Sequence, residues 1–220
     1  MAQSTLFDAA APAPGSRRAT ELEPGAVVLH AFAIDDAPAL LQAIDRVTQA
    51  APWRHMTTAR GWTMSVGTTN CGDAGWLSDE RGYRYDAIDP LTNRRWPPLP
   101  TVFVELAALA ARAAGFGEFV PDACLINRYE PGAKLSLHQD RDEQDFGAPI
   151  VSVSLGVPAM FLWGGGTRAQ RPRRVLLAHG DVVVWGGPAR LNFHGIDTLR
   201  VNAHALTGHF RFNLTFRRAR

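Results

Sequence analysis

Residues 125–140 read LINRYEPGAKLSLHQD, and this stretch decides the fold class. Apolar and aromatic residues at 125–129 and again at 134–140 predict two short strands. Pro131-Gly132 lies between them and is a turn signal. The stretch therefore predicts a strand, a turn and a second strand that ends on His138-Gln139-Asp140.

Further strands are expected at regular intervals up to the C-terminus. They cover residues 150–155, 159–163, 175–177, 182–185, 191–194 and 210–217, with turn residues between them. About eight strands thus fall in about a hundred residues, which fits a double-sheet jelly roll with a pocket between its sheets. We predict a mainly β fold with flanking helices (α+β), in which residues 121–220 form the jelly-roll (double-stranded β-helix) core.

The N-terminal half is predicted to be less regular. Residues 1–24 are rich in Ala, Pro, Ser and Gly, so we expect a disordered tail. Helical spacing follows the N-cap residues Asp35-Asp36, and a second helix is expected at 102–114. Residues 71–100 resemble a long loop but carry several aromatic side chains, which favours a lid. Residues 25–120 are therefore expected to form helices and this lid.

Composition indicates one main globular domain. The chain has 220 residues, of which 46% are hydrophobic and 20% charged, and these values exclude collagen-like and wholly disordered proteins. The longest uncharged stretch contains many Gly and is expected to form strands and turns, so no membrane span is predicted. No signal peptide is expected either. Cys71 and Cys124 lack metal-ligand spacing and are expected to be reduced thiols in the cytoplasm.

Basic residues are concentrated in the C-terminal third, although the formal net charge is only +2. From residue 146 onward, ten arginines accompany only two acids, Asp181 and Asp197. Four arginines fall within seven residues: Arg168, Arg171, Arg173 and Arg174. Such a cluster favours a polyanionic partner. A solvated basic hairpin is the alternative.

Three residues are candidate metal ligands. His138 and Asp140 lie two apart at the end of a predicted strand, so they are expected to face the same side. A jelly roll can bring His194, near the end of a later strand, beside them. Two imidazoles and one carboxylate form the facial triad that holds Fe(II) in oxygen-activating enzymes. The alternative is a set of satisfied polar residues at strand ends.

A second His-x-Asp pair, His179-Gly180-Asp181, is assigned to structure. It immediately precedes the apolar strand at 182–185. In such a turn the Asp satisfies backbone groups and the His faces solvent.

The last predicted strand has one apolar and one polar face. The apolar face carries Phe210, Phe212, Leu214 and Phe216, and the polar face carries Arg211, Asn213, Thr215 and Arg217. The polar face is either the solvent side of an edge strand or part of the pocket. In the pocket its two guanidiniums require anionic partners, which a small dicarboxylate supplies. Asn127 and Tyr129 share one strand face and can hydrogen-bond the same anion.

Residues 123–140, 179–187 and 213–217 together strongly resemble the bacterial AlkB family. That family comprises Fe(II)- and 2-oxoglutarate-dependent dioxygenases that repair alkylated bases in DNA and RNA. Residues 63–76 are similar to its nucleotide-recognition lid. The resemblance covers roughly residues 55–218 and does not include the N-terminal tail.

The resemblance implies a role for each candidate residue. The Fe(II) ligands would be His138, Asp140 and His194. Arg211 and Arg217 would each pair with one carboxylate of 2-oxoglutarate, the cosubstrate used with O2. Hydrogen bonds to this cosubstrate would come from Asn127, Tyr129 and Asn213. Substrate contacts would come from Trp76, Tyr83, Asp142 and Arg168, with Trp76 and His138 on either side of a flipped base.

The implied reaction is oxidative demethylation of 1-methyladenine or 3-methylcytosine in DNA, with RNA as an alternative. Methylation blocks the Watson–Crick edge, so such a base is easily extruded. Its positive charge would gain from stacking on Trp76 and from the Asp142 carboxylate. The coupled products would be succinate and formaldehyde, and we expect a monomer.

Three other protein classes share parts of this pattern. A dioxygenase of the same fold acting on a protein or small metabolite would need neither the aromatic lid nor the basic hairpin. In a non-catalytic jelly-roll module the triad would be structural or hold another metal. Hydrolytic zinc chemistry would leave the two pocket arginines without a purpose.

Overall fold

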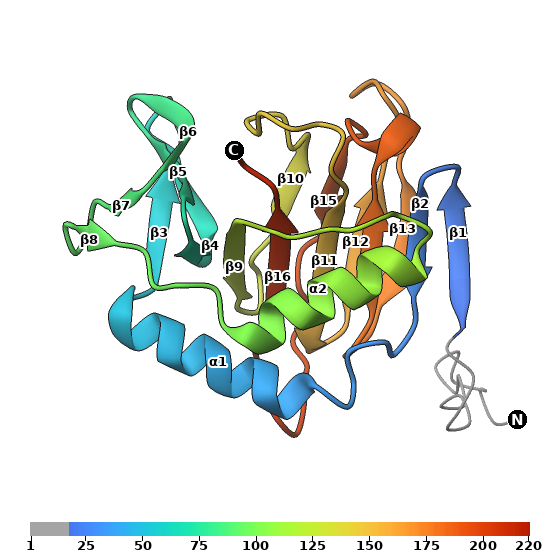
Figure 1. Ribbon diagram of the computed structural model, residues 1–220, viewed down its shortest axis with the longest axis horizontal. Helices are drawn as coiled ribbons and strands as arrows, with labels where there is room; N and C mark the ends of the chain where they lie inside the picture. Colours follow the sequence, from blue (N-terminus) through green and yellow to red (C-terminus); the bar gives the residue numbers. More distant parts are fainter. Residues whose placement is uncertain (1–17) are drawn as a thin grey trace, which may run out of the picture.

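Two antiparallel β-sheets form the centre of the computed structural model, which describes residues 18–220 (Figure 1). The larger sheet has eight strands, in the spatial order β1 (Ala19–Glu23), β2 (Ala26–Leu29), β14 (Val182–Trp185), β11 (Ile150–Gly156), β16 (Arg211–Arg217), β9 (Ala123–Tyr129), β4 (Thr63–Gly72) and β3 (Arg54–Thr57). The smaller sheet contains β10 (Leu135–His138), β15 (His194–Ile196), β12 (Ala159–Trp163) and β13 (Arg173–Leu177). Apolar side chains from both sheets form one buried cluster between them. The jelly-roll prediction is confirmed.

Two α-helices cover the outer face of the larger sheet (Figure 1). They are α1 (Ala37–Ala50) and α2 (Thr101–Ala113), close to the predicted positions. Their buried faces pack on the apolar face of β16, where the Phe103 and Phe216 rings meet edge to face at 5.7 Å. Asp36 occupies the N-cap position of α1, as predicted, although its side chain makes no capping hydrogen bond. No helix in residues 18–220 has the length and apolar character needed to cross a bilayer.

The closing strand β16 lies inside the larger sheet, between β11 and β9. Its polar residues Arg211, Asn213, Thr215 and Arg217 are all buried and face the pocket between the sheets. The alternation predicted from the sequence is confirmed, and the edge-strand alternative is wrong. A central position also means that both backbone edges of β16 are hydrogen-bonded, which holds these polar side chains in fixed places.

The N-terminal segment is more ordered than the sequence suggested. Residues 19–23 belong to β1, so the predicted tail is wrong there, because pairing with β2 satisfies their backbone groups. The part of the predicted tail at residues 1–17 lies outside the described residues. The larger sheet also takes strands from both sides of residue 120, so it does not follow the boundary expected at that position.

The prediction of a loop at residues 71–100 is also wrong. The segment continues β4 to Gly72 and then forms two small hairpins, β5 (Gly75–Asp79) with β6 (Gly82–Asp86) and β7 (Ile88–Asp89) with β8 (Arg94–Arg95). These strands are too short to show clear periodicity, and cross-strand aromatic pairs such as Trp76 opposite Tyr85 stabilise the first hairpin. We call β5–β6 the lid hairpin; Figure 1 shows it at one end of the larger sheet.

Two strand boundaries near the candidate ligands differ from prediction. The strand expected at 134–140 ends at His138, so Asp140 lies in coil and strand alternation does not place it. The strand expected at 191–194 begins only at His194. The preceding residues turn instead: a short 3-10 helix, η1 (Gly187–Ala189), is followed by a hydrogen bond from Asn192 N to Ala189 O.

Helix α2 supplies a matched test of the outer core. Leu106 is buried at 2% exposure, whereas Leu109 on the same helix is 51% exposed. We expect Leu106→Ala to lower the free energy of unfolding by about 2–5 kcal/mol, because it leaves a cavity against the sheet. Leu109→Ala should cost less than about 1 kcal/mol. Urea denaturation measures both, and equal losses would contradict the packing of α2 described here.

Candidate active site

A pocket lies between the two sheets. Seven predicted site residues line it: Asn127, Tyr129, His138, His194, Arg211, Asn213 and Arg217. Most of them come from β9 and β16, which are neighbours in the larger sheet, while His138 and His194 come from the smaller sheet. Residues far apart in the sequence thus meet because adjacent strands present alternate side chains to the same space.

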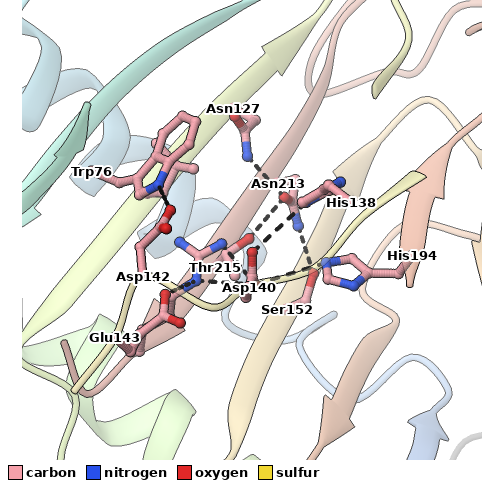
Figure 2. Close-up of polar contacts among 12 residues, drawn as sticks. Trp76, Asn127, His138, Asp140, Asp142, Glu143, Ser152, His194, Asn213 and Thr215 are labelled. Carbon is pink, nitrogen blue, oxygen red and sulfur yellow. Dashed lines mark hydrogen bonds and ion pairs between the residues drawn. The ribbon is translucent and has the colours of Figure 1, made fainter. Parts of the chain in front are cut away.

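His138, Asp140 and His194 come together at one end of this pocket (Figure 2). The two histidines are paired residues of β10 and β15. Asp140 Oδ1 lies 3.7 Å from His138 Nε2, and Asp140 Oδ2 lies 3.7 Å from His194 Nε2. The potential ligand atoms all lie within 4.8 Å of one another. This spacing leaves room for one ion between them.

Backbone carbonyls orient both imidazole rings. His138 Nδ1 lies 2.9 Å from Ser136 O, and His194 Nδ1 lies 3.1 Å from Asn192 O. A carbonyl only accepts, so each Nδ1 carries hydrogen and each Nε2 directs a lone pair toward Asp140. Burial, reinforced by His138, lowers the pKa of His194 to about 4 and keeps it neutral. The donor set therefore fits a divalent metal with open coordination positions, including Fe(II).

Arg211 is a buried cation without an acidic partner. Its Nη2 donates to Ser154 Oγ at 2.9 Å, and its guanidinium lies 4.9 Å from the centre of the Tyr129 ring. Its Nε and Nη1 atoms are buried and have no hydrogen-bond partner. Burial, partly opposed by Tyr129, lowers the pKa of Arg211. Such an orphaned guanidinium fits a ligand carboxylate.

Arg217, in contrast, already has partners. Its Nη2 and Nε donate to Asp140 Oδ2 at 2.9 and 3.1 Å, and Nε lies 3.3 Å from Glu143 Oε1. Burial acts to raise the pKa of Asp140, but Arg217 and the two histidines hold it below its ordinary value. The inference that both pocket guanidiniums need an external anion is therefore wrong for Arg217, whose charge the protein itself balances.

Four polar residues at or beside the pocket were not predicted: Ser152, Ser154, Glu143 and Arg190. Asn213 Nδ2 donates to Ser152 Oγ at 2.8 Å, and Asn127 Nδ2 donates to Asn213 Oδ1 at 3.2 Å (Figure 2). Ser152 and Ser154 lie two apart in an otherwise apolar buried strand, a signal that could have identified them. Glu143 and Arg190 form a buried ion pair beside Arg217, and no sequence pattern indicates that contact.

The four predicted substrate residues lie outside the inner pocket. Trp76 Nε1 donates to Asp142 Oδ2 at 2.8 Å, and the Trp76 and Tyr83 rings stack at 5.5 Å (Figure 2 shows the Trp76–Asp142 contact). Arg168 Nη2 donates to Leu137 O at 2.6 Å, next to His138. The structure thus groups Trp76, Tyr83 and Asp142 and places Arg168 beside one candidate ligand.

The second His-x-Asp pair is structural, as predicted. Asp181 accepts hydrogen bonds from the backbone N–H groups of Ala31 and Ala178 at 2.8 and 2.9 Å. His179 is half-buried and accepts from Gly156 N at 2.9 Å, so its predicted exposure to solvent is wrong.

The arginine-rich hairpin is only partly free. Arg174 pairs with Asp197 at 2.5 Å, and Arg173 Nη1 donates to Leu22 O. Arg171 is exposed and makes no ion pair with any described residue. The surface remains basic, but fewer than four of its arginines are available to a polyanion.

Comparisons with known proteins agree with this geometry. Residues 25–217 match the family model of the 2OG-Fe(II) oxygenase superfamily. The alpha-ketoglutarate-dependent dioxygenase AlkB of Salmonella typhimurium is 58% identical over 90% of this chain and 92% of its own. The chain belongs to the AlkB family of 2-oxoglutarate- and Fe(II)-dependent dioxygenases. The Escherichia coli AlkB is 56% identical with the same coverage. The solved structure of OsALKBH1 superimposes with a TM-score of 0.82 at 28% identity, covering 91% of this chain and 100% of that one.

The two pocket arginines give a paired stability test. Arg211→Met should raise the unfolding free energy of the ligand-free chain by about 1–3 kcal/mol, because it removes an unpaired buried charge. Arg217→Met should lower it by about 3–5 kcal/mol, because Asp140 then loses its counter-charge. Chemical denaturation without metal or cosubstrate measures both. Destabilisation of similar size in the two variants would contradict the different pairing described here.

Proposed function

We propose that this dioxygenase demethylates N-alkylated bases in nucleic acid. This proposal rests on the His138–Asp140–His194 cluster beside the pocket that contains Arg211, whose buried Nε and Nη1 atoms have no hydrogen-bond partner. The curated relatives support a nucleic-acid substrate, since they include a "tRNA demethylase abh1" and a "Nucleic acid dioxygenase ALKBH1". A protein or metabolite substrate is less favoured because the pocket mouth carries stacked aromatics beside an acid.

The pocket residues have separate roles in this proposal. His138, Asp140 and His194 hold Fe(II), which when bound supplies O2 activation at the expense of 2-oxoglutarate. Arg211 binds one carboxylate of 2-oxoglutarate with its two free N–H groups. Arg217 contacts the other carboxylate while keeping its bond to Asp140. Asn127, Tyr129 and Asn213 provide the remaining hydrogen bonds and fix the orientation of the cosubstrate.

The mouth residues recognise a cationic base. Trp76 offers a stacking surface, and Asp142 retains one carboxylate oxygen, Oδ1, without a hydrogen bond from any described residue. 1-Methyladenine and 3-methylcytosine carry the positive charge that this oxygen favours. Tyr83 and Arg168 contact the nucleic-acid backbone. Hydroxylation of the methyl group followed by loss of formaldehyde restores the base.

We propose that the base binds in a flipped-out conformation. The pocket lies between two sheets, and a base stacked within a helix cannot reach it. We further propose that the enzyme acts as a monomer on DNA, with RNA as a second substrate, in the cytoplasm. Both described cysteines are free thiols, which suits that compartment.

The metal assignment is tested by removing each ligand. His138→Ala, Asp140→Ala and His194→Ala should each reduce turnover of a 1-methyladenine oligonucleotide by about a hundredfold or more, since ligand changes cost more than outer-shell changes. After incubation with Fe(II) and 2-oxoglutarate, mass analysis of the oligonucleotide measures demethylation as a loss of about 14 Da, one CH2, for each methyl group. His55→Ala, an exposed histidine outside the pocket, is the control. Near-parental activity in any ligand variant at low Fe(II) would refute the triad.

Charge recognition is tested at Asp142. Asp142→Asn keeps an oxygen that accepts from Trp76 Nε1 but removes the negative charge. Activity on 1-methyladenine and 3-methylcytosine should fall about tenfold more than activity on neutral 1-methylguanine. Asp145→Asn changes an acid on the same loop that pairs with Arg218, so it should leave this ratio unaltered. Equal losses on cationic and neutral bases in Asp142→Asn would rule out recognition by charge.

A further inference from the structure

Two side chains of the lid hairpin contact consecutive acids of the loop that follows Asp140. Trp76 and Tyr85 are directly opposite each other in β5 and β6, so they lie on the same face. Trp76 Nε1 donates to Asp142 Oδ2 at 2.8 Å, and the Tyr85 hydroxyl donates to Glu143 Oε1 at 2.6 Å. The hairpin is therefore fastened to this loop at two adjacent points.

The two points differ in depth. Asp142 is half-buried, and Trp76 is its hydrogen-bond partner. Glu143 is 5% exposed and has cationic partners at both oxygens. Its Oε2 accepts from Arg190 Nη2 at 3.1 Å, while its Oε1 lies 3.3 Å from Arg217 Nε. The oxygen that receives the Tyr85 hydroxyl is thus the one that faces Arg217.

This shared oxygen links the lid hairpin to the pocket. Arg217 also donates to Asp140, and Arg190 Nη1 donates to Asp140 O at 2.7 Å. If the hairpin moved away, Glu143 would lose the hydrogen bond from Tyr85, and water would reach a set of charges that is buried in this structure. Buried polar networks depend on every member, so the position of Arg217 becomes less restrained.

We propose that Tyr85 is a positioning residue that couples closure of the lid hairpin to the holding of Arg217, so that lid closure and 2-oxoglutarate binding strengthen each other. The inference rests on the proposed function in one respect, the contact of Arg217 with a cosubstrate carboxylate. Trp76 has the other role: its bond to the half-exposed Asp142 can be exchanged for a base while the Tyr85–Glu143 bond keeps the inner network closed.

Coupling of this kind is reciprocal. Because a closed hairpin favours the cosubstrate, the cosubstrate must protect the hairpin from opening by the same factor. Loss of the single Tyr85 hydroxyl should therefore affect two measurements at once, the affinity for 2-oxoglutarate and the protection that 2-oxoglutarate gives to the backbone amides of β5 and β6.

The test uses the full chain with Fe(II) under anaerobic conditions and without nucleic acid. Calorimetry measures 2-oxoglutarate affinity, and hydrogen exchange measures the β5–β6 amides with and without the cosubstrate. In Tyr85→Phe we expect affinity to fall about threefold to tenfold, and the protection gained on binding to fall by a similar factor. Glu80→Gln changes an exposed side chain in the turn of the same hairpin, which makes no hydrogen bond or ion pair with a described residue, and it should change neither quantity.

A purely structural role for Tyr85 gives a different result. The hairpin amides of Tyr85→Phe would then exchange faster by one factor with and without 2-oxoglutarate, and the affinity would match the parent; this result overturns the proposal. Glu143→Gln serves as a second variant, since it weakens the bond from the other side and should lower both quantities in the same direction. If Glu143→Gln left both unchanged, the coupling would also be refuted.

Arg217→Ala separates this inference from the proposed function. If Arg217→Ala bound 2-oxoglutarate with the parental affinity, the proposed contact between Arg217 and a cosubstrate carboxylate would be refuted, and the coupling with it. If Arg217→Ala bound 2-oxoglutarate more weakly but Tyr85→Phe bound it with the parental affinity, only the coupling would be refuted. Because nucleic acid is absent from these measurements, the identity of the methylated substrate does not affect their outcome.

Discussion

The buried ion pair between Asp140 and Arg217 is the contact on which the rest of the site depends. Asp140 lies two residues beyond the end of β10, so no strand pairing holds it. Its position comes from Arg217, at the end of the central strand β16, and from Arg190, which donates to its backbone carbonyl. One ligand of the metal cluster is thus fixed by charge, while the two histidines are fixed by the pairing of β10 with β15.

Charge balance explains why so many ionised groups are tolerated here. Asp140 and Glu143 are matched by Arg190 and Arg217, and all four are buried. A divalent metal and a dicarboxylate would add equal and opposite charges, so loading would leave the charge balance of these four groups unchanged. Arg211 is the exception: it has no acid of its own, and its burial is unfavourable until a carboxylate arrives. The unpaired charge of Arg211 therefore lowers the free energy of unfolding of the ligand-free protein, and binding of a carboxylate would relieve this cost.

The sequence predicts the parts of the site that depend on strand alternation. The polar face of residues 210–217 is predictable because side chains alternate with a period of two. The sequence left open whether this face is exposed or buried, and the central position of β16 in the sheet decides that it is buried. His138 lies opposite His194 because of the register between β10 and β15. The strand expected at 191–194 has a different start, so the sequence does not predict this register. The bond between Tyr85 and Glu143 spans 58 positions in the sequence and joins a hairpin predicted as loop to a coil segment, so no periodicity indicates it.

The inner and outer halves of the site also differ in how firmly they are held. The residues proposed to bind the cosubstrate lie on β9 and β16 within an eight-stranded sheet, whereas Trp76 and Tyr83 lie on a hairpin of two strands. A two-stranded hairpin has little stability of its own. Its position therefore comes from contacts with the rest of the chain. Ser78 bonds to Thr57 of β3, Trp76 bonds to Asn70 of β4, and the hairpin also contacts the loop that begins at the candidate metal ligand Asp140. The surface proposed to meet the base and the residues proposed to hold the cosubstrate are consequently joined by one set of hydrogen bonds, so a change in one of them alters the other.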